Sequence, residues 1–123
     1  MSRDVSLKSC KISKWRFREL KAIVMQYDER KSRIIDLISL PSVFGGSGGS
    51  TGPGDPTAMA AMRIAHLQAI NDIIDAVCGM FHQGIILRKA AGFMDAIRLG
   101  YIGSQRTFYR ERRRFYCELD KLL

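Results

Sequence analysis

Residues 93–123 read FMDAIRLGYIGSQRTFYRERRRFYCELDKLL, and the pattern in this segment sets the interpretation of the whole chain. Ser104 is a suitable N-cap for a helix that runs from there to the C-terminus. At about 100° per residue, apolar side chains collect on one face of that helix: Phe108, Phe115, Leu119 and Leu122. Polar and basic side chains collect on the opposite face: Arg106, Tyr109, Arg110 and Arg113. The first face predicts packing on a neighbouring helix, and the second predicts exposure.

A shorter helical segment, residues 92–99, precedes a turn that contains two glycines. We expect Ala96, Ile97 and Ile102 to dock the apolar face of the long helix on this segment. A short supporting helix, a tight turn and a helix with one basic face are the parts of a helix-turn-helix. No segment alternates with period two for long enough to predict a strand. The expected fold is therefore all-α, with a helix-turn-helix at its C-terminal end.

The side chains of the long helix suit a role in reading DNA. Arginine can bond two acceptors of guanine at once, glutamine does so with adenine, and both also bind phosphates. Gln105 and Arg106 lie in the first turn and are expected to contact bases, whereas Arg112 and Arg114 point sideways, toward the DNA backbone. Tyr109 would pack on a sugar or a thymine methyl group. The predicted DNA-binding residues are Gln105, Arg106, Tyr109, Arg110, Arg112, Arg113 and Arg114.

Two other interpretations of this basic helix stay open at this point. Four arginines fall within five positions, from Arg110 to Arg114, and only Glu111 and Glu118 offset them. The helix could therefore be a solvated basic surface without a specific task. It could also bind another polyanion or an acidic protein.

The N-terminal part is predicted to form one long helix from Ser13, a suitable N-cap, to Leu40, where Pro41 ends it. Its apolar positions follow heptad spacing, with Lys31 as an interruption. These positions are Leu20, Val24, Tyr27, Ile34 and Ile38. Such a stripe needs a partner helix, in this chain or in another.

A second long helix follows a Gly- and Ser-rich segment, residues 45–54, whose composition is typical of a linker. Asp55 as N-cap and Pro56 at the first helical position open this helix, which runs to about Met80. Its apolar residues are three and four apart: Leu67, Ile70, Ile74, Val77 and Phe81.

The two stripes predict a long helical hairpin or, equally well, helices that pair between chains, and we expect a homodimer. The chain then divides into three parts. Residues 1–44 form a helical arm, residues 45–54 form the linker, and residues 55–123 form the DNA-binding unit, with the second long helix and the helix-turn-helix.

The charge of the chain is concentrated at its two ends. Its 20 Lys and Arg side chains, against 12 Asp and Glu, give a net charge of +8. Residues 1–40 have a net charge of +5, residues 41–103 are neutral, and residues 104–123 have a net charge of +3. This distribution favours a polyanionic partner, which could be DNA, RNA or an anionic membrane surface. The basic face of the C-terminal helix favours double-stranded DNA among these. A hydrophobic content of 46% indicates a folded chain.

Several kinds of site and location are not expected. Cys10, Cys78 and Cys117 lie far apart without a CxxC motif or a Cys/His cluster, which argues against a disulfide framework and a zinc site. The Gly-rich segment lacks the Lys of a phosphate-binding loop, so we expect no nucleotide and no other cofactor. Because the chain has neither the apolar core of a signal peptide nor a run of about eighteen apolar residues, we expect a soluble cytoplasmic protein without membrane contact.

We also expect no enzymatic activity. His66 and His82 are sixteen positions apart on apolar segments, and Asp72 and Asp75 are one helical turn apart, which structural or solvated side chains explain. Tyr109 among arginines is similar to the nucleophile of recombinases. That chemistry, however, needs several Arg and His groups that converge on one phosphate.

Several short motifs resemble those of the RinA/ArpU-type late-gene regulators of phages and prophages in Gram-positive bacteria. The motifs are Gly54-Asp55-Pro56-Thr57-Ala58, Leu99-Gly100-Tyr101-Ile102, Thr107-Phe108-Tyr109-Arg110 and Arg113-Arg114-Phe115. The resemblance implies a C-terminal helix-turn-helix similar to region four of bacterial sigma factors. It also implies sequence-specific DNA binding in the cytoplasm of a bacterial host, with bacterial RNA polymerase as a candidate second partner.

The alternative function is a small basic phage protein that binds and inhibits, or redirects, a host complex that handles nucleic acid. Its binding surface would be the N-terminal arm, with Trp15, Arg16, Phe17, Arg18 and Lys21 as contacts. The two functions make opposite predictions. A DNA reader loses activity when Arg106 and Arg110 become alanine, whereas an adaptor loses activity when the arm is changed.

Overall fold

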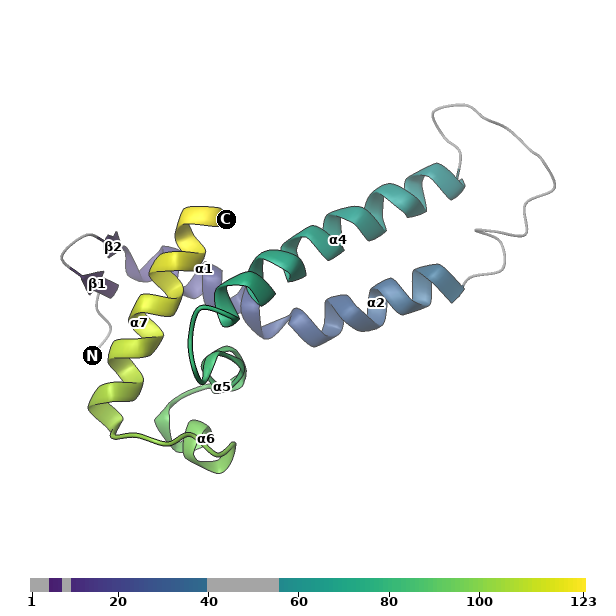
Figure 1. The fold of residues 1–123 in the computed structure, drawn as a ribbon. Coiled ribbons are helices and arrows are strands. Elements are labelled where there is room, and N and C mark those ends of the chain that lie inside the picture. The colour runs from purple at the N-terminus through teal and green to yellow at the C-terminus, as the bar shows by residue number, and fades with distance from the viewer. Residues whose placement is uncertain (1–4, 8–9, 40–55) are drawn as a thin grey trace. The chain divides into compact units, whose positions relative to one another are not determined.

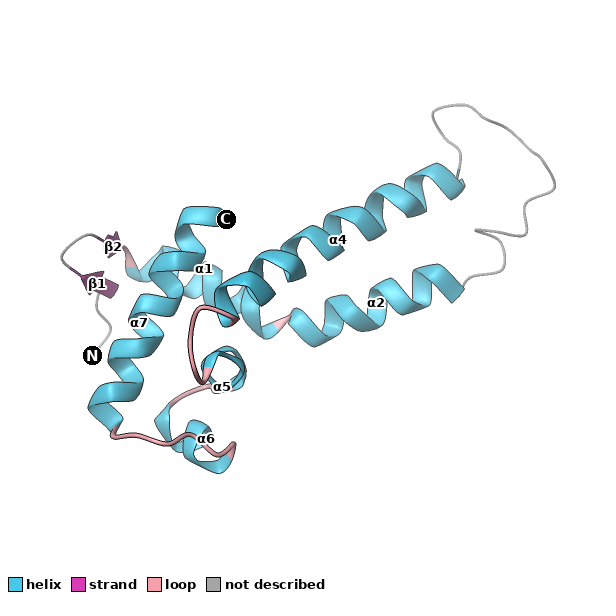
Figure 2. Ribbon diagram, in the orientation of Figure 1, coloured by secondary structure: helices cyan, strands magenta, loops and turns pink. Residues whose placement is uncertain are grey.

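The structure is a computed structural model that describes residues 5–7, 10–39 and 56–123. These residues form an all-α fold with one small β-hairpin, as predicted for the fold class (Figures 1 and 2). The strands are β1 (Val5–Leu7) and β2 (Cys10–Ile12), and the helices are α1 (Lys14–Met25), α2 (Tyr27–Ser39), α4 (Pro56–Cys78), α5 (Gly84–Lys89), α6 (Phe93–Arg98) and α7 (Gln105–Leu122). The predicted linker, residues 45–54, and the predicted N-cap Asp55 lie outside the described residues.

The chain divides into two compact units. The first, called the α7 unit here, consists of residues 1–26 and 73–123, and the second, the hairpin unit, consists of residues 27–72. One boundary between them falls at Gln26, where the predicted continuous helix is wrong. The Gln26 N–H is shared between the carbonyl oxygens of Ala22 and Ile23, at 3.2 and 3.3 Å, and α2 starts at the next residue. The segment holds no Gly or Pro, so nothing in its composition predicts this break.

The α7 unit is built around the apolar face of its longest C-terminal helix. Phe108, Phe115 and Leu119 are fully buried, as predicted, whereas Leu122 is 55% exposed. Buried Tyr116 and Cys117 widen the face, and the ring of Phe17 from α1 packs edge-on against Tyr116 with centroids 4.9 Å apart. Helices α1, α5 and α6 all contact α7. The start of α1 is the predicted one, because the Ser13 side chain accepts a hydrogen bond from the N–H of Arg16 at 3.1 Å.

The β-hairpin corrects two expectations. Strand β1 pairs antiparallel with β2, from Val5 opposite Ile12 to Leu7 opposite Cys10, although the sequence predicted no strand. Strands of three residues are too short to show a period of two. Cys10 is joined to Cys117 of α7 by a disulfide bond across 107 positions, so the expected absence of a disulfide is also wrong. Sequence spacing does not reveal which distant cysteines the fold brings together.

In the hairpin unit, α2 and residues 56–72 of α4 lie side by side and run antiparallel (Figure 1). The Nε of Arg30 donates to the Oδ1 of Asn71 at 2.6 Å, and the Nδ2 of Asn71 donates to the carbonyl of Tyr27 at 3.2 Å. Burial lowers the pKa of Arg30, which is 7% exposed. The helical hairpin was predicted, but the buried stripe of α2 includes Arg30, while Ile38 of the predicted stripe is 50% exposed.

Candidate nucleic-acid interface

Helix α6 ends in a hydrogen-bonded turn that sets the start of α7. The N–H of Tyr101 donates to the carbonyl of Ala96 at 2.8 Å, and the N–H of Gly100 donates to that of Ile97 at 3.0 Å. These two bonds form a Schellman motif, which needs a residue with positive φ after the helix, and Gly100 has φ of +101°. After the turn, the Ser104 side chain accepts from the N–H of Thr107 at 3.1 Å and caps α7, as predicted.

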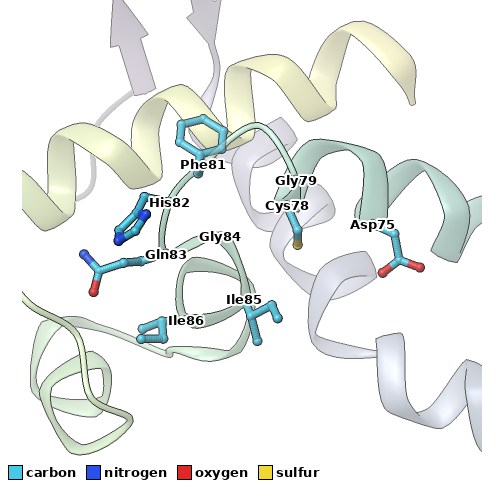
Figure 3. A pocket seen from close by; sticks show the side chains of 9 residues that line it. All are labelled: Asp75, Cys78, Gly79, Phe81, His82, Gln83, Gly84, Ile85 and Ile86. Atoms are coloured by element: carbon cyan, nitrogen blue, oxygen red, sulfur yellow. The ribbon is translucent and has the colours of Figure 1, made fainter.

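A side chain from another loop holds the same turn in place. The Nε2 of Gln83 donates to the carbonyl of Ile102 at 2.9 Å, and the N–H of Ile102 donates to the Oε1 of Gln83 at 2.8 Å. Figure 3 shows Gln83 projecting from the loop that joins α4 to α5. On the other side, the hydroxyl of Tyr101 donates to the carboxylate of Glu111. Sequence reasoning missed Gln83, because nothing near it in the chain indicates a partner nineteen positions away.

The turn changes which side chains join α6 to α7. Ala96 is fully buried as predicted, but Ile97 is 45% exposed and Ile102 is 82% exposed, so their predicted docking role is wrong. The Schellman motif brings Tyr101 inward instead, and its ring meets Phe108 edge-on with centroids 5.3 Å apart. Aromatic packing therefore fixes the orientation of α7 relative to α6.

The N-terminal half of α7 carries its positive charge outward. Five arginines and one glutamate occupy residues 105–114, while residues 115–123 hold one lysine, one glutamate and one aspartate. Glu111 is the single acidic residue of this half, and its carboxylate accepts a hydrogen bond from Tyr101 in the turn. The exposed residues among the predicted DNA-binding set are Gln105, Arg106, Arg110, Arg113 and Arg114, and Tyr109 is half-buried.

Arg112 differs from the other arginines of α7. Its guanidinium lies 4.9 Å from the ring centroid of Tyr109 and 5.5 Å from those of Phe17 and Phe108, and its Nη1 donates to the carbonyl of Ala91 at 3.2 Å. Burial lowers the pKa of Arg112. The side chain predicted to bind the DNA backbone thus connects α1, α7 and the loop after α5.

The predicted arm contacts divide into exposed side chains and side chains with partners inside the protein. Trp15 is 65% exposed, and the guanidinium of Arg18 lies 5.0 Å from its ring centroid. Arg16 is engaged by the carboxylates of Asp120, at 2.6 Å, and Glu19, at 2.7 Å, and these hydrogen bonds raise its pKa.

Lys21 donates to the carbonyl of Ala91 at 3.1 Å, and its pKa is lowered by burial and then by the charge of Arg112. Of the five predicted arm residues, Trp15 and Arg18 are therefore exposed, whereas Arg16 and Lys21 are engaged and Phe17 packs on Tyr116.

A hollow of about 560 Å³ lies beside the first turn of α7, lined by Ala91, Gly92, Phe93, Met94, Asp95, Gln105 and Tyr109. The Asp95 carboxylate in its wall accepts from the N–H of Ala91 at 3.0 Å and from Arg98, and these bonds lower its pKa. Most of the remaining lining is apolar. Such a surface, next to exposed arginines, can accommodate a sugar ring or a methyl group beside a bound phosphate.

A second pocket, of about 510 Å³, lies where α4 passes into α5, and Figure 3 shows the nine residues that line it, from Asp75 to Ile86. His82 of this pocket is exposed, and burial raises the pKa of the free thiol of Cys78. Across residues 5–7, 10–39 and 56–123, no three His, Cys, Asp or Glu side chains are grouped so that they could hold a metal ion.

Within the same described ranges, no helix has the length and apolar character needed to cross a membrane. The chain matches no protein-family model, no curated protein and no solved structure.

Proposed function

We propose that this protein is a sequence-specific DNA-binding transcriptional regulator of the phage late-gene type, with α6, the turn and α7 as its helix-turn-helix. The observation that carries the proposal is the charge and exposure of the first half of α7. Arg106, Arg110 and Arg113 extend into solvent from a helix whose opposite face is anchored by buried aromatic rings, and the nearby Glu111 is engaged by Tyr101.

The packing of α7 on buried rings matters because base recognition needs side chains at fixed positions. Recognition helices contact bases mainly with their N-terminal residues, and the N-terminal turn of α7 carries Gln105 and Arg106. Gln105 would read adenine and Arg106 would read guanine. Arg110, Arg113 and Arg114 would bind phosphates, and the hollow beside Tyr109 would receive a sugar or a thymine methyl group. Arg112 has no DNA contact in this proposal, because its guanidinium is engaged by rings and by Ala91.

The second candidate function is the adaptor that binds a host nucleic-acid-handling complex, and the observation that favours it is exposed Trp15. Tryptophan is enriched at protein interfaces, and Trp15 lies on α1 with Lys14 and Arg18 both within 5.1 Å of its ring centroid. A bacterial RNA polymerase would be one such complex. The two candidates place the decisive residues on different helices, so one set of variants separates them.

The test is a titration of the purified protein with duplex DNA from upstream of its own coding sequence and with scrambled DNA, at several salt concentrations. We expect binding to the first to be about a thousandfold tighter and to weaken steeply with salt. Arg106→Ala with Arg110→Ala should reduce specific affinity by about a hundredfold or more. The matched control is Trp15→Ala with Arg18→Ala, which should leave DNA affinity unchanged. Equal, weak binding to both DNAs would contradict the proposal and favour the adaptor.

A further inference from the structure

The β-hairpin is bonded to the same face of α7 that carries the exposed arginines. Positions 106, 110, 113 and 117 follow steps of four, three and four residues, so their side chains leave the helix within about 60° of one another. The first three positions hold exposed arginines, and the fourth is Cys117, which is 3% exposed. Its Sγ is bonded to that of Cys10 in β2, and both strands contact α7. The β-hairpin is therefore attached where the row of arginines ends, since Cys117 lies about 6 Å beyond Arg113 along the helix axis.

The β-hairpin presents a lysine on its outer side. Cys10 and Ile12 are on the side of β2 that faces α7, because Cys10 is bonded to the helix and Ile12 is 2% exposed. Side chains alternate along a strand, so Lys11 is on the other side, and it is exposed. Because the β-hairpin lies on the arginine face of α7, its outer side points in the same general direction as the arginines. Lys11 thus continues the row of positive charges beyond Arg113.

The acidic side chains at this end of α7 are engaged by other groups. Asp120 accepts from Arg16 at 2.6 Å, and Glu118 accepts from Lys121 at 3.0 Å. Residues 1–14 carry four basic side chains and one acidic side chain. A polyanion that lies along the arginines would therefore meet further positive charge at the β-hairpin, and not repulsion.

We propose that the β-hairpin is a second DNA-contacting element, in which Lys11 binds a backbone phosphate beside the bases that α7 reads, and that the disulfide bond between Cys10 and Cys117 holds it in position. This inference rests on the proposed DNA-binding function. Lysine binds a phosphate as a point charge, and a phosphate contact carries no sequence information. The β-hairpin then adds affinity for any duplex, whereas the first turn of α7 supplies the specificity.

The disulfide makes this contact sensitive to a dithiol reductant. One thiolate of the dithiol forms a mixed disulfide with one cysteine, and the second thiolate displaces that cysteine as the dithiol closes to a ring. Cys10 and Cys117 each gain one electron and one proton, and the dithiol loses two of each. The reduced β-hairpin keeps Ile12 in the core but loses its covalent bond to the arginine face. Lys11 then has no fixed position beside the arginines, so its contribution to DNA affinity falls.

The test is the DNA titration of the oxidised full chain at several salt concentrations, repeated with Lys11→Ala. We expect this change to weaken binding to upstream and to scrambled DNA by the same factor, about five- to tenfold, and to lower the salt slope by about one. The control Lys89→Ala removes the same charge from an exposed position at the end of α5 and should change neither quantity. A wild-type chain that binds no DNA would overturn the proposed function and this inference together. Specific binding by the wild-type chain with an unchanged slope in Lys11→Ala would overturn the inference alone.

Reduction gives a second readout. The reduced wild-type chain should bind both DNAs about five- to tenfold more weakly than the oxidised chain, while its helical circular dichroism is retained. Lys11→Ala should then have almost no further effect, because two changes that remove one contact are not additive. The variant with Cys10→Ser and Cys117→Ser should match the reduced chain with and without the dithiol. An effect of Lys11→Ala that is equally large in the oxidised and the reduced chain would overturn the role of the disulfide.

Discussion

The α7 unit carries sixteen basic and seven acidic side chains, whereas the hairpin unit carries four basic and five acidic side chains. The interior of the α7 unit is lined by aromatic rings, whereas the two helices of the hairpin unit are joined by the buried hydrogen bond between Arg30 and Asn71. In the first unit, four ring pairs that involve residues of α7 have centroids within 5.3 Å, and two more, with Phe81 and Phe93, have centroids 5.9 Å apart. The difference indicates a division of tasks. The basic unit with its aromatic interior carries the helix proposed here to bind DNA, whereas the hairpin unit has almost no net charge.

The largest expected effect comes from Phe108→Ala, which would break the aromatic interior of the α7 unit alone. Phe108 is fully buried and its ring neighbours Phe93, Tyr101 and Tyr109. We expect a loss of about 3–5 kcal/mol in the free energy of unfolding, because a large cavity would form. Hydrogen exchange should accelerate in α6 and α7 but not in α2.

Met94→Ala, at a side chain that is 79% exposed, is the control and should change stability little. If Phe108→Ala accelerated exchange equally in α2, the two units would unfold together and the comparison between them would fail.

The next effect concerns the disulfide between Cys10 and Cys117, which belongs to the α7 unit. A bond that closes a loop of 107 residues restricts the unfolded chain, so its reduction should lower the free energy of unfolding by roughly 2–5 kcal/mol. Urea denaturation with and without a dithiol reductant measures this loss. The variant with both cysteines changed to serine should lose a similar amount and should no longer respond to the reductant. A response that persists in this variant would show that the reductant acts elsewhere.

The helices that the sequence predicted are those whose signal is local. The α7 helix has a regular apolar face and a Ser104 cap, and both can be read within a few turns of one helix. The same holds for Ser13 at the start of α1, whereas the sequence left open whether α2 and α4 pair within one chain or between chains. In the candidate site, the exposed arginines 106, 110 and 113 were placed correctly on one face, since the helical period alone fixes their direction.

The features that were missed depend on contacts between distant parts of the chain. These features join residues between 19 and 107 positions apart: the disulfide between Cys10 and Cys117, the hydrogen bonds between Gln83 and Ile102, and the contact of the Arg112 guanidinium with the ring of Phe17. The exposure of Ile97 and Ile102 follows from a Schellman motif that turned Tyr101 inward, and the sequence showed two glycines there but not which neighbour would be buried. Helical periodicity carries no information on either kind of feature.

An intermediate effect is expected in the hairpin unit, from the pair of Arg30 and Asn71. Asn71→Ala removes the acceptor at 2.6 Å from the buried guanidinium of Arg30, and we expect a loss of about 1–3 kcal/mol in the free energy of unfolding. Hydrogen exchange should accelerate in α2, the reverse of the Phe108→Ala pattern. Gln68→Ala, at an exposed position one turn earlier on α4, is a control for changes to α4 itself. Unchanged protection of α2 in Asn71→Ala would mean that apolar contacts alone join the two helices.

The smallest effect is a dependence on alkaline pH that is confined to the α7 unit. Burial raises the pKa of Tyr116 to about 12, whereas the unfolded chain has the ordinary value near 10. The folded state therefore holds this proton more tightly, so its contribution to stability is complete below pH 10 and is lost as the pH rises toward 12. Stability should fall by about 1.4 kcal/mol per pH unit in this window. Urea denaturation at pH 9, 10 and 11 measures the slope, and Tyr116→Phe should flatten it, since phenylalanine has no proton to lose. An equal slope in Tyr116→Phe would assign the alkaline loss to the other groups that lose a proton there, the buried thiol of Cys78 among them, rather than to the ring of Tyr116.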